Sequence, residues 1–159
     1  MDVVKALLEV GRRELVMLTA DDGVNCLWIS AQEGLLDVVN ALLEAGGREL
    51  TMLTRDNGAS CLWISALNGH LDVVSALLED GGRELALLTR DDGVSCLWIS
   101  VQEGHLDVVN ALLEVGGREL LVLTTDDGVS CLSAAREANR REVFRLLEMA
   151  CQNAGLSLH

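Results

Sequence analysis

One hexapeptide recurs along the chain at a spacing of 35 residues. SCLWIS stands at residues 60–65 and 95–100, and NCLWIS stands at 25–30. The similarity extends further, because residues 21–55 and 91–125 are identical at 28 of their 35 positions. They differ only at positions 25, 31, 35, 45, 51, 52 and 55. A fixed period of this length predicts an array of small units that stack and share one continuous core.

The repeat divides the chain into units. Three complete units span residues 21–55, 56–90 and 91–125. Residues 126–159 diverge, because LSAA replaces LWIS and polar and charged residues enter the helix pair, and we interpret them as a C-terminal capping repeat. Residues 1–20 match only the second half of a unit, so we interpret them as a partial N-terminal repeat. We expect a single array over residues 1–159.

The pattern within one unit predicts two short helices and a finger. In the third unit Ser95 is a suitable N-cap for a helix that ends at Gly104. Residues 106–113 then place apolar side chains at helical spacing, and the glycine pair at 116–117 terminates the run. The segment RELLVLTTDDG predicts a helical turn, an extended piece and a tight turn. The expected fold class is therefore all-α.

The stretch DGVSCLWISVQEGHLDVVNALLEVGG resembles the ankyrin repeat. The matching positions of the third unit are Ser95, Leu97, Gly104, His105, Val108, Val109, Leu112 and Leu113. The resemblance covers nearly the whole chain, and it implies an ankyrin-like helix-turn-helix repeat solenoid with extended finger loops. It also implies a module that binds a protein partner through its concave face and finger tips.

Three features depart from the ankyrin pattern. Cysteine replaces the usual proline, so the side chain of the residue before it must define the helix start. Tryptophan replaces the histidine that bonds between repeats, which exchanges a polar contact for apolar bulk and one indole donor. The unit is also about two residues longer than the usual ~33. The positions are Cys26, Cys61, Cys96 and Cys131, and Trp28, Trp63 and Trp98.

These two ladders have structural and functional interpretations. The tryptophans either fill the core or form an aromatic strip that binds small ligands, especially cations, and we favour the core. Equivalent cysteines of stacked helices lie about 8–10 Å apart, too far for a disulfide or a shared metal ion, so we expect buried free thiols. Cys151 has no counterpart in other units, and one interpretation is an exposed, oxidisable thiol.

Other repeated polar residues have plain structural explanations. The aspartates of the DDG sequences lack the spacing of a calcium loop, so we expect turn formation and no metal site. His70 and His105 stand where the second helix begins, and we favour a structural role. The Arg48–Glu49 pair and its copies are expected to decorate the surface.

Composition and charge exclude several classes of partner. The net charge of −13 would repel a phosphate backbone, so we expect no nucleic acid partner. Every apolar run is interrupted and no basic, apolar leader is present, which predicts a soluble protein without a membrane partner. Five cysteines without a secretion signal favour a reducing compartment, cytoplasmic or nuclear.

One cluster runs against the acidic composition near the C-terminus. Its members are Arg136, Arg140, Arg141 and Arg145. The cluster is either a solvated face of the last helix pair or a docking patch for an acidic partner.

No motif of an enzyme occurs in the sequence, so we expect no catalytic activity and no cofactor. We predict a scaffold that binds a basic or mixed-charge protein, with the centre of the interface at Leu67 and Asn68. The candidate contact residues are Gln32, Glu33, Leu67, Asn68, Gln102 and Glu103 at the helix ends, Asp56, Asn57, Asp91 and Asp92 at the finger tips, and Val24, Ala59, Val94 and Val129 after the turns.

Two alternatives and one extension remain open. The near-identity of the units is also consistent with a structural spacer or a fragment of a longer ankyrin array. The tryptophan ladder is the basis of the second alternative, binding of a small ligand or cation. The N-terminal partial repeat has no cap, so self-association through that helix is possible in either case.

Overall fold

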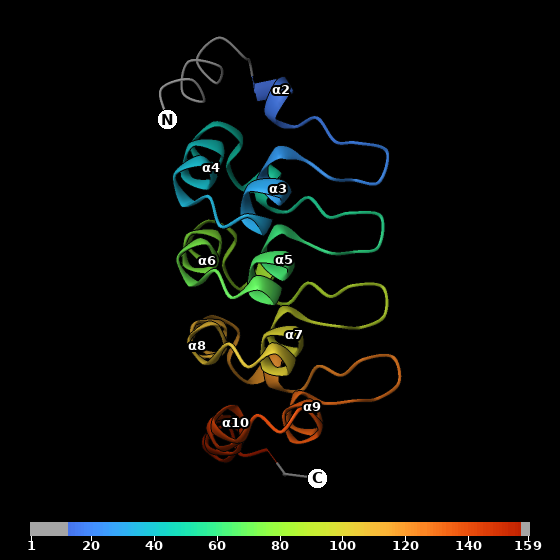
Figure 1. The fold of residues 1–159 in the computed structure, drawn as a ribbon, viewed down its shortest axis with the longest axis vertical. Coiled ribbons are helices and arrows are strands. Elements are labelled where there is room, and N and C mark those ends of the chain that lie inside the picture. The colour runs from blue at the N-terminus through green and yellow to red at the C-terminus, as the bar shows by residue number, and fades with distance from the viewer. Residues whose placement is uncertain (1–12, 157–159) are drawn as a thin grey trace.

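The computed structural model describes residues 13–156 (Figure 1), and this part of the chain is a stack of helix pairs. The short helix α2 (Arg13–Val16) comes first. The first helices of the pairs are α3 (Cys26–Gln32), α5 (Cys61–Asn68), α7 (Cys96–Glu103) and α9 (Cys131–Glu137). The second helices are α4 (Leu36–Thr51), α6 (Leu71–Ala86), α8 (Leu106–Leu121) and α10 (Arg141–Asn153).

The helices form two columns, and the fingers form a third. Figure 1 shows α4, α6, α8 and α10 stacked along one side, the first helices stacked beside them, and the fingers projecting from the opposite side. The described residues contain no strand, only isolated bridges at the bases of the fingers. The prediction of an all-α solenoid with extended fingers is confirmed.

Local signals start and stop the first helices as the sequence predicts. The Oγ atoms of Ser60 and Ser95 accept hydrogen bonds from the backbone N–H of Trp63 (3.1 Å) and Trp98 (3.0 Å). These N-caps satisfy backbone donors that have no partner within the helix. At the other end Gly104 is left-handed, with a φ of 85°, which an L residue adopts only at a cost.

The glycine pair in each second helix behaves differently from the prediction. Only the second glycine breaks the helix: Gly117 has a φ of 54°, and one further helical turn follows it. The first glycine, Gly116, stays helical, and a Cβ there would lie 2.8 Å from Cβ of Leu120, so the close packing of Leu120 requires a glycine. Leu120 is fully buried, so the glycine lets this last turn fold back onto the core.

The fingers are tight hairpins that bond to one another. In one finger Arg55 N–H donates to the carbonyl of Ala59 at 2.9 Å, closing the turn. Between fingers, Asp91 N–H donates to the carbonyl of Asn57 (3.0 Å), and Asp126 N–H donates to that of Asp92 (3.0 Å). The fingers therefore stack at a fixed register along the array.

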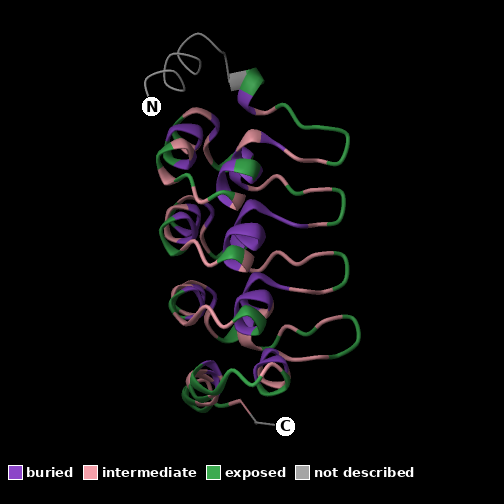
Figure 2. Ribbon diagram, in the orientation of Figure 1, coloured by how far each residue is buried: buried purple, intermediate pink, exposed green. Residues whose placement is uncertain are grey.

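The core lies between the two helix columns, where Figure 2 shows the buried residues. Its largest fully buried side chains are leucines and valines, including Leu62, Leu77 and Leu97. Ser30, Ser65 and Ser100 are buried with them, and their hydroxyls donate to carbonyls of the preceding helical turn, as Ser100 does to Leu97 at 2.8 Å. Aliphatic side chains thus fill most of the space between neighbouring units.

All five cysteines are free thiols, and the ladder lies inside the stack. Cys61, Cys96 and Cys131 are buried. The Cys96 thiol donates to the carbonyl of Ala86 at 3.1 Å, which links the start of a first helix to the end of the preceding second helix. The interpretation of Cys151 as exposed is wrong, because α10 turns this side chain inward and leaves it only 8% exposed.

These thiols give the protein a pH dependence above neutrality. Burial raises the pKa of Cys61, Cys96 and Cys131 to about 12, from 9.0. Between those pH values the unfolded chain can ionise its thiols and the folded chain cannot, so we expect stability to fall as the pH rises above 9. Urea unfolding at pH 8 and pH 10.5, compared with the variant C61A/C96A/C131A, measures the effect. Equal pH slopes for the two proteins would contradict it.

Candidate protein-binding surface

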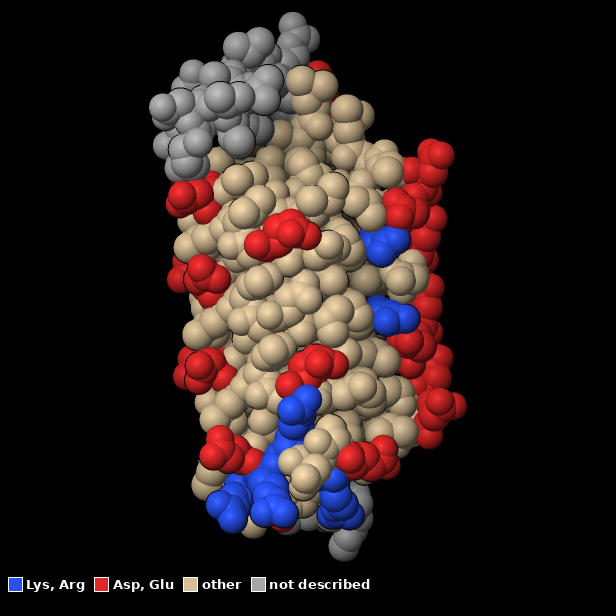
Figure 3. Space-filling model, viewed as in Figure 1, with Lys and Arg blue, Asp and Glu red and all other residues tan. Residues whose placement is uncertain are grey.

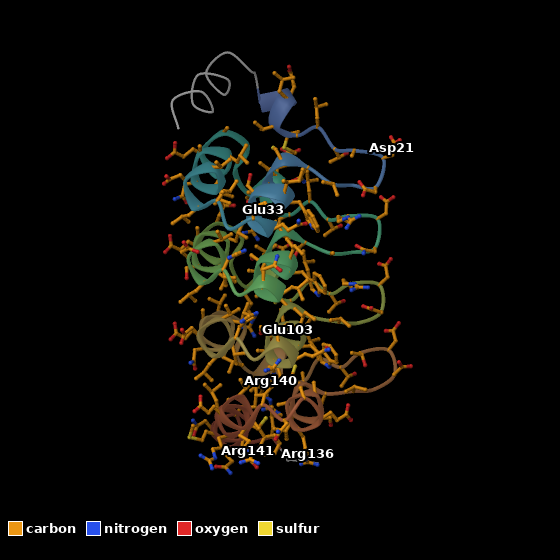
Figure 4. All side chains as sticks on the ribbon, viewed as in Figure 1. Asp21, Glu33, Glu103, Arg136, Arg140 and Arg141 are labelled. Atoms are coloured by element: carbon orange, nitrogen blue, oxygen red, sulfur yellow. The ribbon has the colours of Figure 1, made fainter. Side chains whose placement is uncertain are left out.

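The C-terminal ends of the first helices form one row along the array. The row, called here the helix-end row, consists of Gln32, Glu33, Leu67, Asn68, Gln102 and Glu103. Figure 4 shows Glu33 and Glu103 on the same face of the molecule. Leu67 and Gln32 are partly buried and the other four are exposed. The fold therefore brings these predicted contact residues together on one face.

Hydrogen bonds between units hold the helix-end row in place. The Nε2 atoms of His70 and His105 lie 3.0 and 2.9 Å from the carbonyl oxygens of Gln32 and Leu67. Asn68 Nδ2 also donates to the Gln32 carbonyl, at 3.1 Å. In the last unit Arg140 replaces the histidine, and its Nε donates to the Gln102 carbonyl at 2.9 Å. The histidines therefore have a structural role, joining neighbouring helix ends.

The helix-end row is hollowed where the first two complete units meet. A shallow, open depression there is lined by Gln32, Glu33, Ile64, Asn68 and His70. Three of these five belong to the predicted contact set. The depression offers a buried isoleucine floor among amide and carboxylate groups, a mixture that suits a protein side chain.

The finger tips form a second, acidic row. The row, called here the fingertip column, consists of Asp21, Asp22, Asp56, Asn57, Asp91, Asp92, Asp126 and Asp127, all exposed. Figure 3 shows acidic side chains along the whole edge of the molecule that the fingers occupy. In Figure 4, Asp21 lies at a finger tip, apart from Glu33 and Glu103. The predicted contact residues thus form two rows.

The second acidic or amide residue shapes the turn in the first three tips, whereas in the fourth Thr125 Oγ1 accepts from Val129 N–H at 3.1 Å. Asn57 Oδ1 accepts from Ala59 N–H at 3.1 Å, and Asp92 Oδ1 accepts from Val94 N–H at 3.2 Å. Asp22 Oδ1 accepts the equivalent bond from Val24 N–H. This bond and the nearby Arg55 guanidinium hold the pKa of Asp22 below its usual value. The prediction that Ala59 contacts a partner is wrong, because this residue is only 2% exposed.

Arginines from the fingers cover two of the three tryptophans. The guanidinium carbon of Arg55 lies 4.9 Å from the ring centroid of Trp28, and that of Arg90 lies 4.9 Å from the ring centroid of Trp63. These tryptophans are buried, at 9% and 8% exposure. The indole Nε1 atoms have no hydrogen-bond partner among the described residues, so the predicted indole donor is unused there. A cation–π contact from the following finger occupies the rings instead.

Sequence reasoning missed these arginines, although the signal was present. Arginine follows tryptophan by 27 residues in two successive units, and position 55 is one of those at which the first and third units differ. Without the geometry of the stack, nothing related a finger residue to a helix residue 27 positions earlier in the chain. The ion pair between Arg83 and Glu119 of the following unit (2.7 Å) could not be predicted for the same reason.

The repeated Arg-Glu dipeptides therefore do more than decorate the surface. Arg48 binds Glu84 of the following unit, and its Nη1 atom donates to the carbonyls of Asp80 (3.2 Å) and Gly81 (2.9 Å). Both ion-pair side chains are more than half exposed, so each pair contributes only about 0–1 kcal/mol. Their effect is to align successive second helices.

The basic cluster lies at the C-terminal end of the stack. Figure 4 shows Arg136 of α9, Arg140 in the loop and Arg141 at the start of α10 close together, and Figure 3 shows basic side chains gathered at this end of the molecule. The guanidinium carbon of Arg136 lies 5.4 Å from the centroid of the Phe144 ring. A pocket between these helices is lined by Ala135, Arg136, Asn139, Arg140, Arg141, Phe144, Arg145 and Glu148.

Comparison with known families identifies the fold. The family model "Ankyrin repeats (3 copies)" matches residues 1–87 and 31–122. The chain belongs to the ankyrin repeat family. No curated protein matches the sequence. Ankyrin repeats generally mediate protein–protein interaction, and proteins of this kind are typically interaction modules without enzymatic activity.

None of the helices in residues 13–156 is long and apolar enough to cross a membrane, and the same residues hold no group of three or more potential metal ligands.

Proposed function

We propose that this ankyrin array is a scaffold that binds a basic or mixed-charge protein through its concave face and its finger tips. The observation that carries the proposal is the helix-end row. Its residues repeat on one face, most of them are exposed, and hydrogen bonds between units fix their spacing. A preorganised row of this kind loses little conformational freedom when a partner binds.

The charge of the surface supports the choice of partner. The helix-end row carries Glu33 and Glu103, and the fingertip column carries seven aspartates in four tips. Arg55 and Arg90 neutralise part of this charge, through Asp22 and Asp92. The remaining carboxylates favour a partner with lysines or arginines and would accelerate its association at low ionic strength.

Affinity capture from the source cells tests the proposal. The six residues of the helix-end row are replaced by alanine in one variant. We expect the wild type to retain a protein that this variant loses. A second variant, D56N/D91N/D126N, removes fingertip charge but keeps the turn-forming residues, and we expect it to weaken retention most at low salt.

A matched control separates a local contact from general electrostatics. E44Q/E79Q/E114Q removes three exposed carboxylates from the second helices, on the other side of the stack, and we expect it to retain the partner. Equal retention by the helix-end variant and the wild type would overturn the proposed surface. If no variant and no wild-type protein retains anything, the array acts as a spacer.

A further inference from the structure

Trp98 lacks the arginine that covers the other two tryptophans. Threonine stands at position 125, where the repeat places Arg55 and Arg90 in the two preceding units. Among the described residues no cation lies over the Trp98 ring, and its side chain is partly exposed, whereas Trp28 and Trp63 are buried. A guanidinium of this chain therefore covers two of the three equivalent tryptophans, and within residues 13–156 the third has none over it.

The backbone around Thr125 matches that around Arg55. Thr125 N–H donates to the carbonyl of Val129 (3.1 Å), as Arg55 N–H does to Ala59 (2.9 Å). Asp126 N–H donates to the carbonyl of Asp92, in the register that the preceding fingers also keep. The open ring of Trp98 thus results from the side chain at position 125, because the finger itself is in place.

The carboxylates that accompany a guanidinium at this site are also present. Arg55 pairs with Asp22 of the preceding finger at 2.7 Å. Arg90 faces Asn57 at that position and pairs instead with Asp92 of its own finger at 3.0 Å. Around Trp98 both positions hold acids, which are Asp92 and Asp127. Asp127 has no ion-pair partner among the described residues, whereas Asp92 is already paired with Arg90, so a guanidinium over Trp98 would share Asp92 with that arginine.

We propose that Trp98, Asp92 and Asp127 form a binding site for an arginine side chain of the partner protein. A planar guanidinium can stack on the indole ring and donate to carboxylates at the same time, as Arg55 does on Trp28 and Asp22. A lysine ammonium stacks less well and has no planar fork, so the site selects arginine over lysine. This inference rests on the proposed function in one respect, which is that the arginine comes from a protein.

Nuclear magnetic resonance of the indole N–H groups tests the site directly. The probe is a capped pentapeptide with one arginine between glycines, and its lysine counterpart is the comparison. We expect a saturable shift of the Trp98 signal, little change at Trp28 and Trp63, and weaker binding of the lysine peptide. Equal shifts of all three tryptophans, or equal affinity for both peptides, would overturn the proposal.

Two substitutions make the test specific. Thr125→Arg supplies the missing arginine, and we expect it to weaken arginine-peptide binding at Trp98 by about tenfold or more. Arg90→Thr uncovers Trp63, and we expect the Trp63 signal to begin to respond. The second variant keeps the proposal falsifiable if the first one folds poorly. A Trp98 response that survives Thr125→Arg, or a Trp63 signal that stays silent in Arg90→Thr, counts against the site.

The source of the arginine is tested with the captured partner. If the peptide binds at Trp98 but Thr125→Arg captures the partner as well as the wild type does, the partner does not use this site and the inference fails. The proposed function then stands on the helix-end row. If instead the helix-end variant captures the partner normally while Thr125→Arg does not, the proposed surface fails and the arginine site stands.

Discussion

Trp63→Ala is expected to lower the free energy of unfolding by about 3–5 kcal/mol, the range for large-to-small substitution of a buried aromatic residue. Trp63 is 8% exposed, packs within the core between units, and lies under the guanidinium of Arg90. The substitution leaves a cavity and also removes the ring that Arg90 covers. Urea unfolding followed by circular dichroism measures the loss.

Trp98→Ala is the matched control for this prediction. Trp98 occupies the same position in the next unit and its backbone N–H bonds to the N-cap in the same way, but it is partly exposed and has no arginine above it among the described residues. We therefore expect a smaller loss of stability for Trp98→Ala. If the two variants are equally destabilised, neither the deeper burial of Trp63 nor its cation–π contact has the effect that we assign to it.

Gly93→Ala is expected to destabilise the fingers for two separate reasons. Gly93 has a φ of 78°, and a Cβ there would lie 2.9 Å from the backbone nitrogen of Asp126 in the next finger. The conformation alone costs roughly 1–2 kcal/mol for an L residue. The close approach adds to this cost, because a backbone atom held in the hydrogen bond to Asp92 must move.

Gly128→Ala separates the two contributions, since Gly128 has the same φ of 78° but a Cβ there would have no atom of the described residues within 4 Å. We expect Gly128→Ala to show only the conformational cost and Gly93→Ala to exceed it, as measured by thermal unfolding. Equal losses would mean that neighbouring fingers can separate without a penalty, which would contradict the fixed register of the stack.

Most of the fold could be predicted because its signals are local. Ser95 caps a helix and Gly104 ends it through preferences of those residues alone, and the 35-residue period then copies the result along the chain. The same reasoning placed the helix-end row on one face, since equivalent residues of stacked units must align. The interaction of that row with a partner stays a proposal.

Several features that could not be predicted depend on contacts between segments that lie far apart in the sequence. The arginines over Trp28 and Trp63 come from the finger that follows each helix pair, and Arg83 pairs with Glu119 of another helix. Which glycine of a pair breaks the helix could not be predicted either, because both residues can adopt a left-handed backbone. The burial of Cys151 could not be inferred from the repeat, because it has no counterpart in the other units and only the packing of α10 shows it.

The tryptophan substitutions change how the units are joined. The histidines that precede α6 and α8 bond to the preceding unit through their rings, as His105 does to the Leu67 carbonyl. On the finger side the tryptophans replace a hydrogen bond with a ring that an arginine covers, as Arg90 covers Trp63. The open ring of Trp98 is therefore a local exception in a repeated contact, and it lies beside the fingertip column.

The affinity of the captured partner for the helix-end variant, compared with that for E44Q/E79Q/E114Q, is the most direct test of the proposed surface. Isothermal titration calorimetry supplies both dissociation constants. We predict that the helix-end variant binds about tenfold more weakly than the wild type, or worse, equivalent to at least ~1.4 kcal/mol, and that the second-helix variant binds like the wild type. Unchanged affinity of the helix-end variant would contradict a binding surface at the ends of the first helices.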